Sequence, residues 1–151
     1  MQTQFNILNI TRNNLLEAIE GLSTEQLNQI PAGFNNSIIW NTAHILVTQQ
    51  LLCYTLSGTV CKIDAAIIDK YRKGTNVENP ASLEEIAYIK KMLVETVDML
   101  KQDYADKEFG PYKVYTTSYN ITLNTVEEAI TFNNVHEGLH LGYIMAQKRT
   151  L

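Results

Sequence analysis

The chain has 151 residues, 45% apolar and 19% charged, which predicts one folded domain over residues 1–151 and excludes a disordered or fibrous protein. Its 12 Lys and Arg residues against 16 Asp and Glu give a net charge of −4, so we expect no nucleic-acid partner, because phosphate binding needs clustered cations. The N-terminus shows no signal-peptide pattern, and no apolar run reaches the roughly 18 residues of a membrane span, so we expect a reduced cytoplasmic protein without membrane attachment.

Apolar residues spaced three and four positions apart predict four long helices, at residues 4–21, 37–57, 83–104 and 125–148. Ser23 with Gln26 predicts a capping box and one extra helical turn after the first helix. Gly58 follows the second helix in the position of a C-terminal cap. Ser82 with Glu85 predicts a capping box at the start of the third helix.

The connections between these helices are long. Residues 59–81 are predicted to contain a short helix around 64–71. Residues 106–124 lead to the fourth helix, with Asn124 as its expected cap, and the β-rich composition at 113–119 fits either a short strand or an ordered loop. We therefore expect an all-α protein, a four-helix bundle with long connecting loops. Long loops in a small bundle often build the mouth of a site.

The chain has three histidines, and two of them, His136 and His140, lie four residues apart in the fourth helix. At about 100° per residue, four positions return to nearly the same face, so both imidazoles can reach one metal ion. Two buried imidazoles with nothing to bind would be costly. The residues around the pair are apolar, which predicts that this face points inward: Phe132, Val135, Leu139, Tyr143 and Ile144.

The third histidine, His44, lies in the second helix, inside a stretch from Gln26 to Cys61 that contains no Asp, Glu, Lys or Arg. Taken alone, His44 is best interpreted as a core histidine hydrogen-bonded to Thr48 or Asn41. Taken with the histidine pair, a metal site is the better interpretation, because bundles assemble metal sites from facing helices. The charge-free stretch also predicts a homodimer, because no face of the second helix is obviously suited to water.

The His-Glu-x-x-His pattern of residues 136–140 also matches the zincin protease signature. Zincins take a third ligand downstream, but the eleven residues after His140 include no His, Asp or Glu, and Ala146 stands at the metzincin position. We therefore interpret Glu137 as a residue on the flank of the helix, and a role as partner of a ligand or as a base stays open. No Cys-x-x-Cys occurs, and we expect Cys53 and Cys61 to be buried, inert thiols.

Two segments resemble one known family. Ser37-Ile-Ile-Trp-Asn-Thr-Ala-His44 resembles the start of the metal-site helix in the DinB-like (DinB/YfiT) superfamily, and residues 136–149 resemble that family's last helix with its His-x-x-x-His. The resemblance implies a four-helix bundle that binds one divalent metal through His44, His136 and His140. It also implies a dimer, which is frequent in the family. Tyr143 stands where Gln is often expected, which is a departure near the ligands or the substrate wall.

Three neutral histidines leave at least one coordination position open, as in catalytic metal sites. Many members of the family are described as metal-dependent hydrolases, so the resemblance implies a hydrolase whose metal activates water or polarises a carbonyl. Other members are S-transferases that use low-molecular-weight thiols such as bacillithiol or mycothiol. A non-catalytic metal-binding stress protein is the third hypothesis. Zn or Ni is expected, with Fe or Mn as alternatives, together with an unidentified small-molecule substrate.

Further residues are candidates for the site. Asn41, Thr48 and Asn133 lie within one or two turns of the histidines and are candidate pocket residues, whereas Glu137 and Tyr143 are candidate catalytic residues. A thiol transferase would also need cations at the pocket mouth to bind the carboxylates of its thiol. The long loops offer several, although loops usually carry charge: Lys62, Lys70, Arg72, Lys73 and Lys113.

Overall fold

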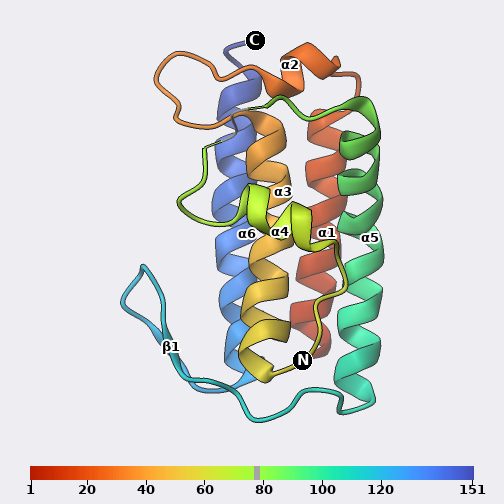
Figure 1. The fold of residues 1–151 in the computed structure, drawn as a ribbon, viewed down its shortest axis with the longest axis vertical. Coiled ribbons are helices and arrows are strands. Elements are labelled where there is room, and N and C mark those ends of the chain that lie inside the picture. The colour runs from red at the N-terminus through yellow and green to blue at the C-terminus, as the bar shows by residue number, and fades with distance from the viewer. Residues whose placement is uncertain (77–78) are drawn as a thin grey trace.

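The computed structural model describes residues 1–76 and 79–151, and it is mostly helical, which confirms the all-α class (Figure 1). In the described part of the chain, no helix combines the length and the apolarity needed to cross a membrane. The elements in chain order are α1 (Gln2–Ile19), α2 (Thr24–Asn28), α3 (Ile38–Gln49), the π-helix η1 (Gln50–Tyr54), the 3-10 helix η2 (Thr55–Ser57), α4 (Ala65–Tyr71), α5 (Leu83–Ala105), β1 (Tyr115–Thr116), β2 (Thr122–Leu123) and α6 (Val126–Lys148).

The four longest α-helices, α1, α3, α5 and α6, lie side by side along the long axis of the molecule (Figure 1). Both α5 and α6 pack against α1 and α3, so each long helix contacts two others. α4 lies across α3, and α2 lies at the end of the molecule where the C-terminus emerges (Figure 1). Apolar side chains from all four helices form the core, among them Leu8, Ile45, Leu93 and Ile144, which are fully buried.

The ends of the helices follow the sequence closely. Ser23 and Gln26 form the predicted capping box of α2, in which each backbone N–H donates to the side chain of the other residue. At the start of α5, Ser82 Oγ accepts from Glu85 N. Gly58 ends η2 with a φ of 68°, the left-handed conformation that favours glycine.

The two long connections are also ordered. The predicted short helix is α4, and residues 113–119 contribute β1, which pairs with β2 in a hairpin of two residues per strand. The fourth long helix begins one residue later than expected, because Thr125 rather than Asn124 is the cap: Thr125 Oγ1 accepts from Glu128 N.

The loop that leads to the hairpin is tied to the end of η2. Gly110 N and Lys113 N donate to the carbonyl oxygens of Ser57 and Leu56, respectively. A Cβ atom on residue 110 would lie 2.9 Å from Ser57 O, so this close approach requires glycine. The loop therefore reaches the hairpin from a fixed point at the end of η2.

The second predicted helix is not regular throughout, because the α-helix ends at Gln49 and continues as a π turn and a 3-10 turn. Gln49 and Gln50 are both fully buried. Gln49 Nε2 donates to Thr96 O, and Gln50 Oε1 accepts from Lys62 N, so different segments of the chain hold the two amides. Such π turns are frequent at functional sites.

The charge-free stretch has an explanation inside the chain. Every residue of α3 from Ile38 to Val47 is buried, and α3 packs against α2, α4, α5 and α6. A charge on any face of this helix would therefore lie in the interior, where an unpaired ion is costly. The lack of charges does not require a second subunit, and the homodimer stays a prediction.

Candidate metal centre

The three histidines meet at the seam between α3 and α6. His44 comes from α3, and His136 and His140 come from successive turns of α6. The ring centroid of His44 lies 5.2 Å from that of His136 and 5.0 Å from that of His140, and the last two lie 4.5 Å apart. One ring nitrogen of each residue lies within 4.8 Å of the others, so the three residues could hold one metal ion.

His44 is oriented by the backbone of the last residue of α4. Its Nδ1 donates to the carbonyl oxygen of Tyr71 at 2.7 Å. Because a carbonyl oxygen only accepts, Nδ1 carries the proton, and the neutral ring has its free lone pair on Nε2. Thr48 Oγ1 lies 3.3 Å from this Nε2, and the indole of Trp40 stacks on the ring with centroids 4.6 Å apart. Contacts with Tyr71 and Thr48 at its nitrogens, and with Trp40 on one face, therefore hold the imidazole ring of His44 in place.

His140 is oriented by two side-chain amides, which are themselves hydrogen-bonded to backbone carbonyl groups. Asn41 Nδ2 donates to Ser37 O at 2.9 Å, so the Asn41 side-chain oxygen faces His140 Nδ1, also at 2.9 Å. That oxygen only accepts, so His140 Nδ1 carries the proton and Nε2 carries the lone pair. Gln147 supports Asn41: its Oε1 accepts from Asn41 Nδ2, and its Nε2 donates to Asn36 O. Two backbone carbonyls thus determine the orientation of the whole chain of amides.

His136 differs from the other two histidines because one of its ring nitrogens lacks a hydrogen-bond partner. Its Nδ1 is buried and has no hydrogen-bond partner in the described part of the chain. A buried polar atom left without a partner costs on the order of 1–3 kcal/mol. Three imidazoles, two of them with the remaining nitrogen anchored, form a donor set that Zn²⁺ and related ions bind. The residues present therefore fit a divalent metal ion.

Burial keeps the three imidazoles neutral near pH 7. It lowers the pKa of His136 to about 3, with His140 and His44 adding to the effect. It lowers the pKa of His140 to about 4, with His44 adding. Burial also lowers the pKa of His44; the hydrogen bond to Tyr71 opposes the shift, and the charge of Lys73 adds to it. The neutral imidazole is the form that binds metal ions.

A cavity of about 270 Å³ opens beside the cluster, and His44, His136 and Thr48 line it. Leucines of η1 and η2, together with Phe132 of α6, form apolar walls, and the hairpin closes one side. Lys73, from the segment after α4, also lines the cavity. The interrupted end of the second long helix therefore contributes directly to the wall of the candidate site.

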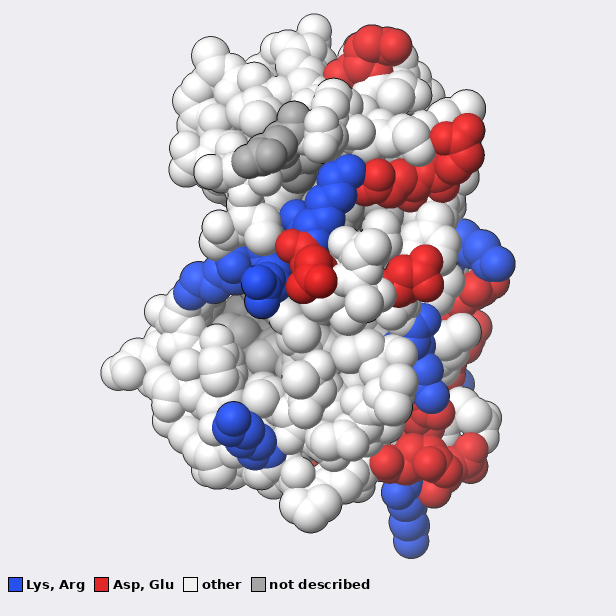
Figure 2. Space-filling view, viewed as in Figure 1, with Lys and Arg blue, Asp and Glu red and all other residues white. Residues whose placement is uncertain are grey.

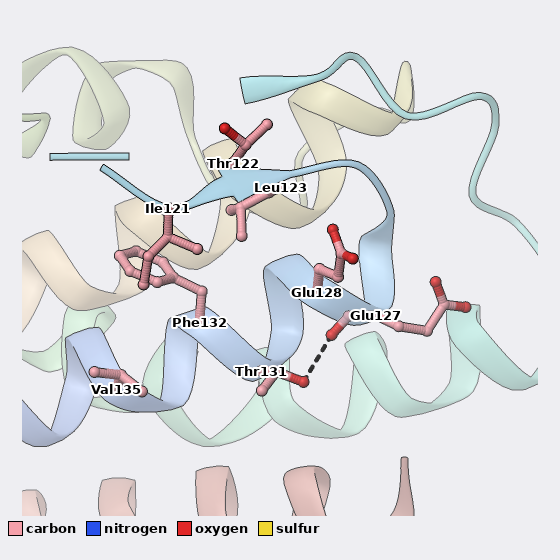
Figure 3. Close-up of a pocket in the computed structure, with 8 residues that line it drawn as sticks. All are labelled: Ile121, Thr122, Leu123, Glu127, Glu128, Thr131, Phe132 and Val135. Carbon is pink, nitrogen blue, oxygen red and sulfur yellow. Dashed lines mark hydrogen bonds between the residues drawn. The ribbon is translucent and has the colours of Figure 1, made fainter. Parts of the chain in front are cut away.

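A second cavity, of about 430 Å³, lies between β2 and α6, and Figure 3 shows the eight residues that line it. None of them is a histidine. Its two carboxylates already have partners, because Glu128 accepts from Asn124 N and Glu127 accepts from Tyr104 OH. This cavity therefore offers less unused binding capacity than the cavity beside the histidines.

Glu137 lies outside the cavity of the histidines, although it directly follows His136 in α6. Its carboxylate is fully buried and accepts two hydrogen bonds from Arg12, at 2.8 and 3.0 Å, and one from Asn133 Nδ2 at 2.7 Å. Arg12 also donates to Thr96 Oγ1 at 2.7 Å. Glu137 thus does lie on the flank of the helix, but that flank is buried, and its carboxylate is engaged in an ion pair.

The other candidate residues are distributed over three places. Thr48 lines the cavity, whereas Asn41 supports His140 from behind. Asn133 binds the carboxylate of Glu137 and does not line the cavity. Tyr143 lies outside the cavity, with its ring 5.2 Å from that of Phe34 in an edge-to-face contact.

The expectation that the apolar neighbours of the histidine pair all face inward is wrong for three of the five. Phe132 and Ile144 are buried, but Val135, Leu139 and Tyr143 are 54%, 51% and 44% exposed. The three exposed residues repeat every four positions, so they share one face of the helix. Val135 directly precedes His136, and Leu139 directly precedes His140. One position is a rotation of about 100°, so the exposed face lies about 100° from the face of the histidines. Apolar neighbours in the sequence therefore do not establish that a helix face is buried.

The two cysteines take no part in the cluster. Cys53 is fully buried, and burial raises the pKa of its thiol, with the charge of Glu137 adding to the effect. Cys61 is partly buried, and its Sγ lies 3.3 Å from Thr55 Oγ1. Neither sulfur belongs to the group that could hold a metal ion.

Arg12 and Gln147 are supporting residues that the sequence analysis missed. Arg12 follows Leu8 at a spacing of four, on the apolar stripe of α1, and a charged residue in such a position signals a buried partner. Gln147 lies seven residues after His140, two turns along the same face of α6. Both signals are visible in the sequence, but neither identifies the partner.

These observations define a class of protein: an all-α chain with a three-histidine group that could hold one metal ion beside a small cavity. The family model described as the DinB superfamily matches residues 7–144, so the chain belongs to the DinB superfamily. The matched range contains the positions of all three histidines, and the match confirms the resemblance to this family. No curated protein matches the chain.

Proposed function

We propose that the protein is a metal-dependent hydrolase built on a four-helix bundle, with one divalent ion bound by His44, His136 and His140. One observation carries the proposal: the buried Nδ1 of His136 lacks a partner, beside two imidazoles whose Nδ1 atoms are anchored. Three ligands leave room for water or substrate, which is typical of catalytic rather than structural sites. Membership of the DinB superfamily supports the proposal.

The side chains around the cluster have separate tasks in this reaction. His44, His136 and His140 would hold the ion, which when bound would lower the pKa of a water molecule to about 7 and polarise a substrate carbonyl. The Tyr71 carbonyl and the Asn41 amide hold His44 and His140 so that each presents a lone pair. Thr48 lines the cavity beside His44, which supports a role for its hydroxyl as a hydrogen-bond partner of the substrate. The apolar walls of the cavity exclude bulk water from the reacting atoms.

A thiol-dependent S-transferase is the second candidate, and one observation favours it. Lys73 lines the cavity together with His44 and His136, and a cation in this place suits a thiol that carries carboxylates, such as bacillithiol or mycothiol. In this reaction the thiolate attacks an electrophilic carbon, an S–C bond forms, and the leaving group departs with its electron pair. A non-catalytic metal-binding stress protein would use the same ligands without turnover.

The first test is elemental analysis of protein purified without a nickel column. We expect about one equivalent of metal, with Zn or Ni ahead of Fe or Mn, because imidazole ligands suit these ions. The His136→Ala/His140→Ala variant should contain almost none. A Val135→Ala/Leu139→Ala variant, altered on the exposed face of the same helix, is the control and should retain the metal. A parent protein that binds no metal, even when metal is added back, would contradict the proposal.

A second experiment separates the three candidate functions. The metal-loaded protein is assayed for hydrolysis of esters and amides, and for transfer of a low-molecular-weight thiol to an electrophilic aromatic chloride. Hydrolysis that disappears in the histidine variant supports the hydrolase, and thiol transfer that disappears supports the transferase. Metal binding without either activity would favour the stress protein.

A further inference from the structure

The cavity beside the histidines has an uneven lining. Leu51, Leu52, Leu56 and Phe132 make most of its wall apolar. Within residues 1–76 and 79–151, Lys73 is the only Lys or Arg that lines it, and none of the described Asp or Glu residues does. Figure 2 shows Lys and Arg side chains across the middle of the face, around α4 and the segment after it, with Asp and Glu side chains beside them, above a largely uncharged surface.

We propose that this cavity takes a small substrate with an apolar body and one anionic group, with Lys73 as the partner of the anion and the histidine cluster at the reacting end. The inference rests on the proposed function, because it assumes a metal ion at the cluster, and it adds the class of substrate. It holds for a hydrolase and for a transferase alike.

The size and walls of the cavity limit the body of the substrate. Its volume of about 270 Å³ is near the lower end for small-molecule sites, which span roughly 300–1,000 Å³. A polar body would lose hydrogen bonds to water against the leucines of η1 and η2 without regaining them. The walls therefore favour a short apolar segment between the two ends of the molecule.

The charges around the cavity favour an anion. Lys62 pairs with Asp103 and Lys70 pairs with Glu85, but Lys73 forms no ion pair within residues 1–76 and 79–151. Lys73 lines the same cavity as His44 and His136, so its charge acts on any group bound beside the cluster. A metal ion at the histidines would add a second positive charge to the same cavity. The cavity would then attract a negative group, and apolar walls strengthen that attraction.

The test uses thiols in pairs of equal length, one ending in a carboxylate and the other in an alcohol. These are 3-mercaptopropionate with 3-mercaptopropanol and 6-mercaptohexanoate with 6-mercaptohexanol. Cobalt(II) is loaded at the site, because its absorption spectrum reports a bound thiolate. In the parent protein, we expect at least one of the carboxylates to bind about 5-fold more tightly than its alcohol, as a partly exposed charge pair predicts.

Three variants locate the effect. Lys73→Met should remove the preference for the carboxylate and leave the affinity for the alcohol unchanged. Lys73→Arg, which keeps the charge, should retain the preference. Lys113→Met is the control, because Lys113 lies in the loop before the hairpin but does not line the cavity, and it should behave like the parent.

The outcomes distinguish this inference from the proposed function. A protein that binds no cobalt would overturn both. A protein that binds cobalt and thiols, but does not prefer the carboxylate of either pair, would overturn the inference about the substrate and leave the metal site intact. A preference that persists in Lys73→Met would also overturn it, because the anion would then have a different partner.

Discussion

Helix α6 carries two buried polar clusters on neighbouring flanks, and they differ in which groups are paired: both have one buried side-chain atom without a partner among the described residues, Nδ1 of His136 and Oδ1 of Asn133, but only the second pairs two charges. The histidine cluster has its Nδ1 atoms anchored at His44 and His140, but the Nδ1 of His136 has no partner in the described part of the chain, and the Nε2 lone pair of His44 has only a long contact of 3.3 Å, with Thr48 Oγ1. On the other flank, Glu137 accepts three hydrogen bonds, and its partner Arg12 donates further bonds to α5. The carboxylate and the guanidinium are satisfied inside the chain.

This difference separates two uses of buried polar groups. A cluster whose charges are paired internally stabilises one arrangement of helices and has little capacity to bind anything else. A cluster with unused lone pairs beside a cavity can bind a ligand. His136 and Glu137 are adjacent in the sequence, so only their partners in space reveal which residue belongs to which kind of cluster.

Breaking the ion pair should give the largest effect. Arg12→Met leaves the Glu137 carboxylate buried without its counter-charge and should lower the free energy of unfolding by about 3–5 kcal/mol. Chemical denaturation measures this loss. The double variant Arg12→Met/Glu137→Met removes both charges and should recover most of the stability. A loss below about 1 kcal/mol for Arg12→Met would contradict the description of Arg12 and Glu137 as charges that are buried and paired with each other.

Loss of the amide support should weaken the metal site without removing a ligand. Gln147→Leu cannot hold Asn41, so His140 is less firmly oriented, and we expect about 10- to 100-fold weaker metal binding in competition with a chelator. Loss of the His140 Nδ1–H signal in the NMR spectrum should accompany it. Asn133→Ala, on the other cluster, is the matched control and should leave the affinity for metal unchanged.

The stability of the metal-free protein should depend on pH through the histidines. Their pKa values are lowered in the folded state, to about 3 for His136 and about 4 for His140, against about 6.5 when unfolded. Below pH 6.5 the unfolded chain therefore binds protons that the folded chain does not, and the free energy of unfolding falls as the pH falls toward 4. At pH 5.5 the expected loss is about 1 kcal/mol for each histidine.

Denaturation in EDTA at pH 7.5 and pH 5.5 measures this loss, because most carboxylates stay ionised over that interval. A variant with Gln in place of all three histidines is the control, and its stability should change less between the two pH values. Equal changes in both proteins would contradict the assignment of the effect to the cluster.

Changes on the exposed face of α6 should have the smallest effect. Leu139 lies between the two histidines but is 51% exposed, so Leu139→Ser should change the free energy of unfolding by no more than about 0.5 kcal/mol. Leu93→Ala, in the core, is the contrast and should cost about 2–5 kcal/mol.

Light scattering on the same samples tests the predicted homodimer, and a species of only 17.1 kDa would contradict it.

The sequence by itself determined the local features of this protein. The positions of the long helices, the cap residues Ser23 and Ser82 and the short helix α4 all depend on interactions within a few residues, so periodicity and capping patterns predict them. The spacing of His136 and His140 places both on one face of a helix for the same reason. These signals, with the segment that ends at His44, were enough to indicate the family and the three candidate ligands.

Only the tertiary structure decided what each side chain contacts. The pairing of Arg12 with Glu137 spans 125 positions, and that of Asn41 with Gln147 spans 106. Such contacts depend on the rotation of each helix about its axis, which packing of the whole core determines and no local pattern encodes. The same packing buries one flank of α6 and exposes Leu139. It also brings Lys73, an exposed residue after α4, to the cavity of the histidines.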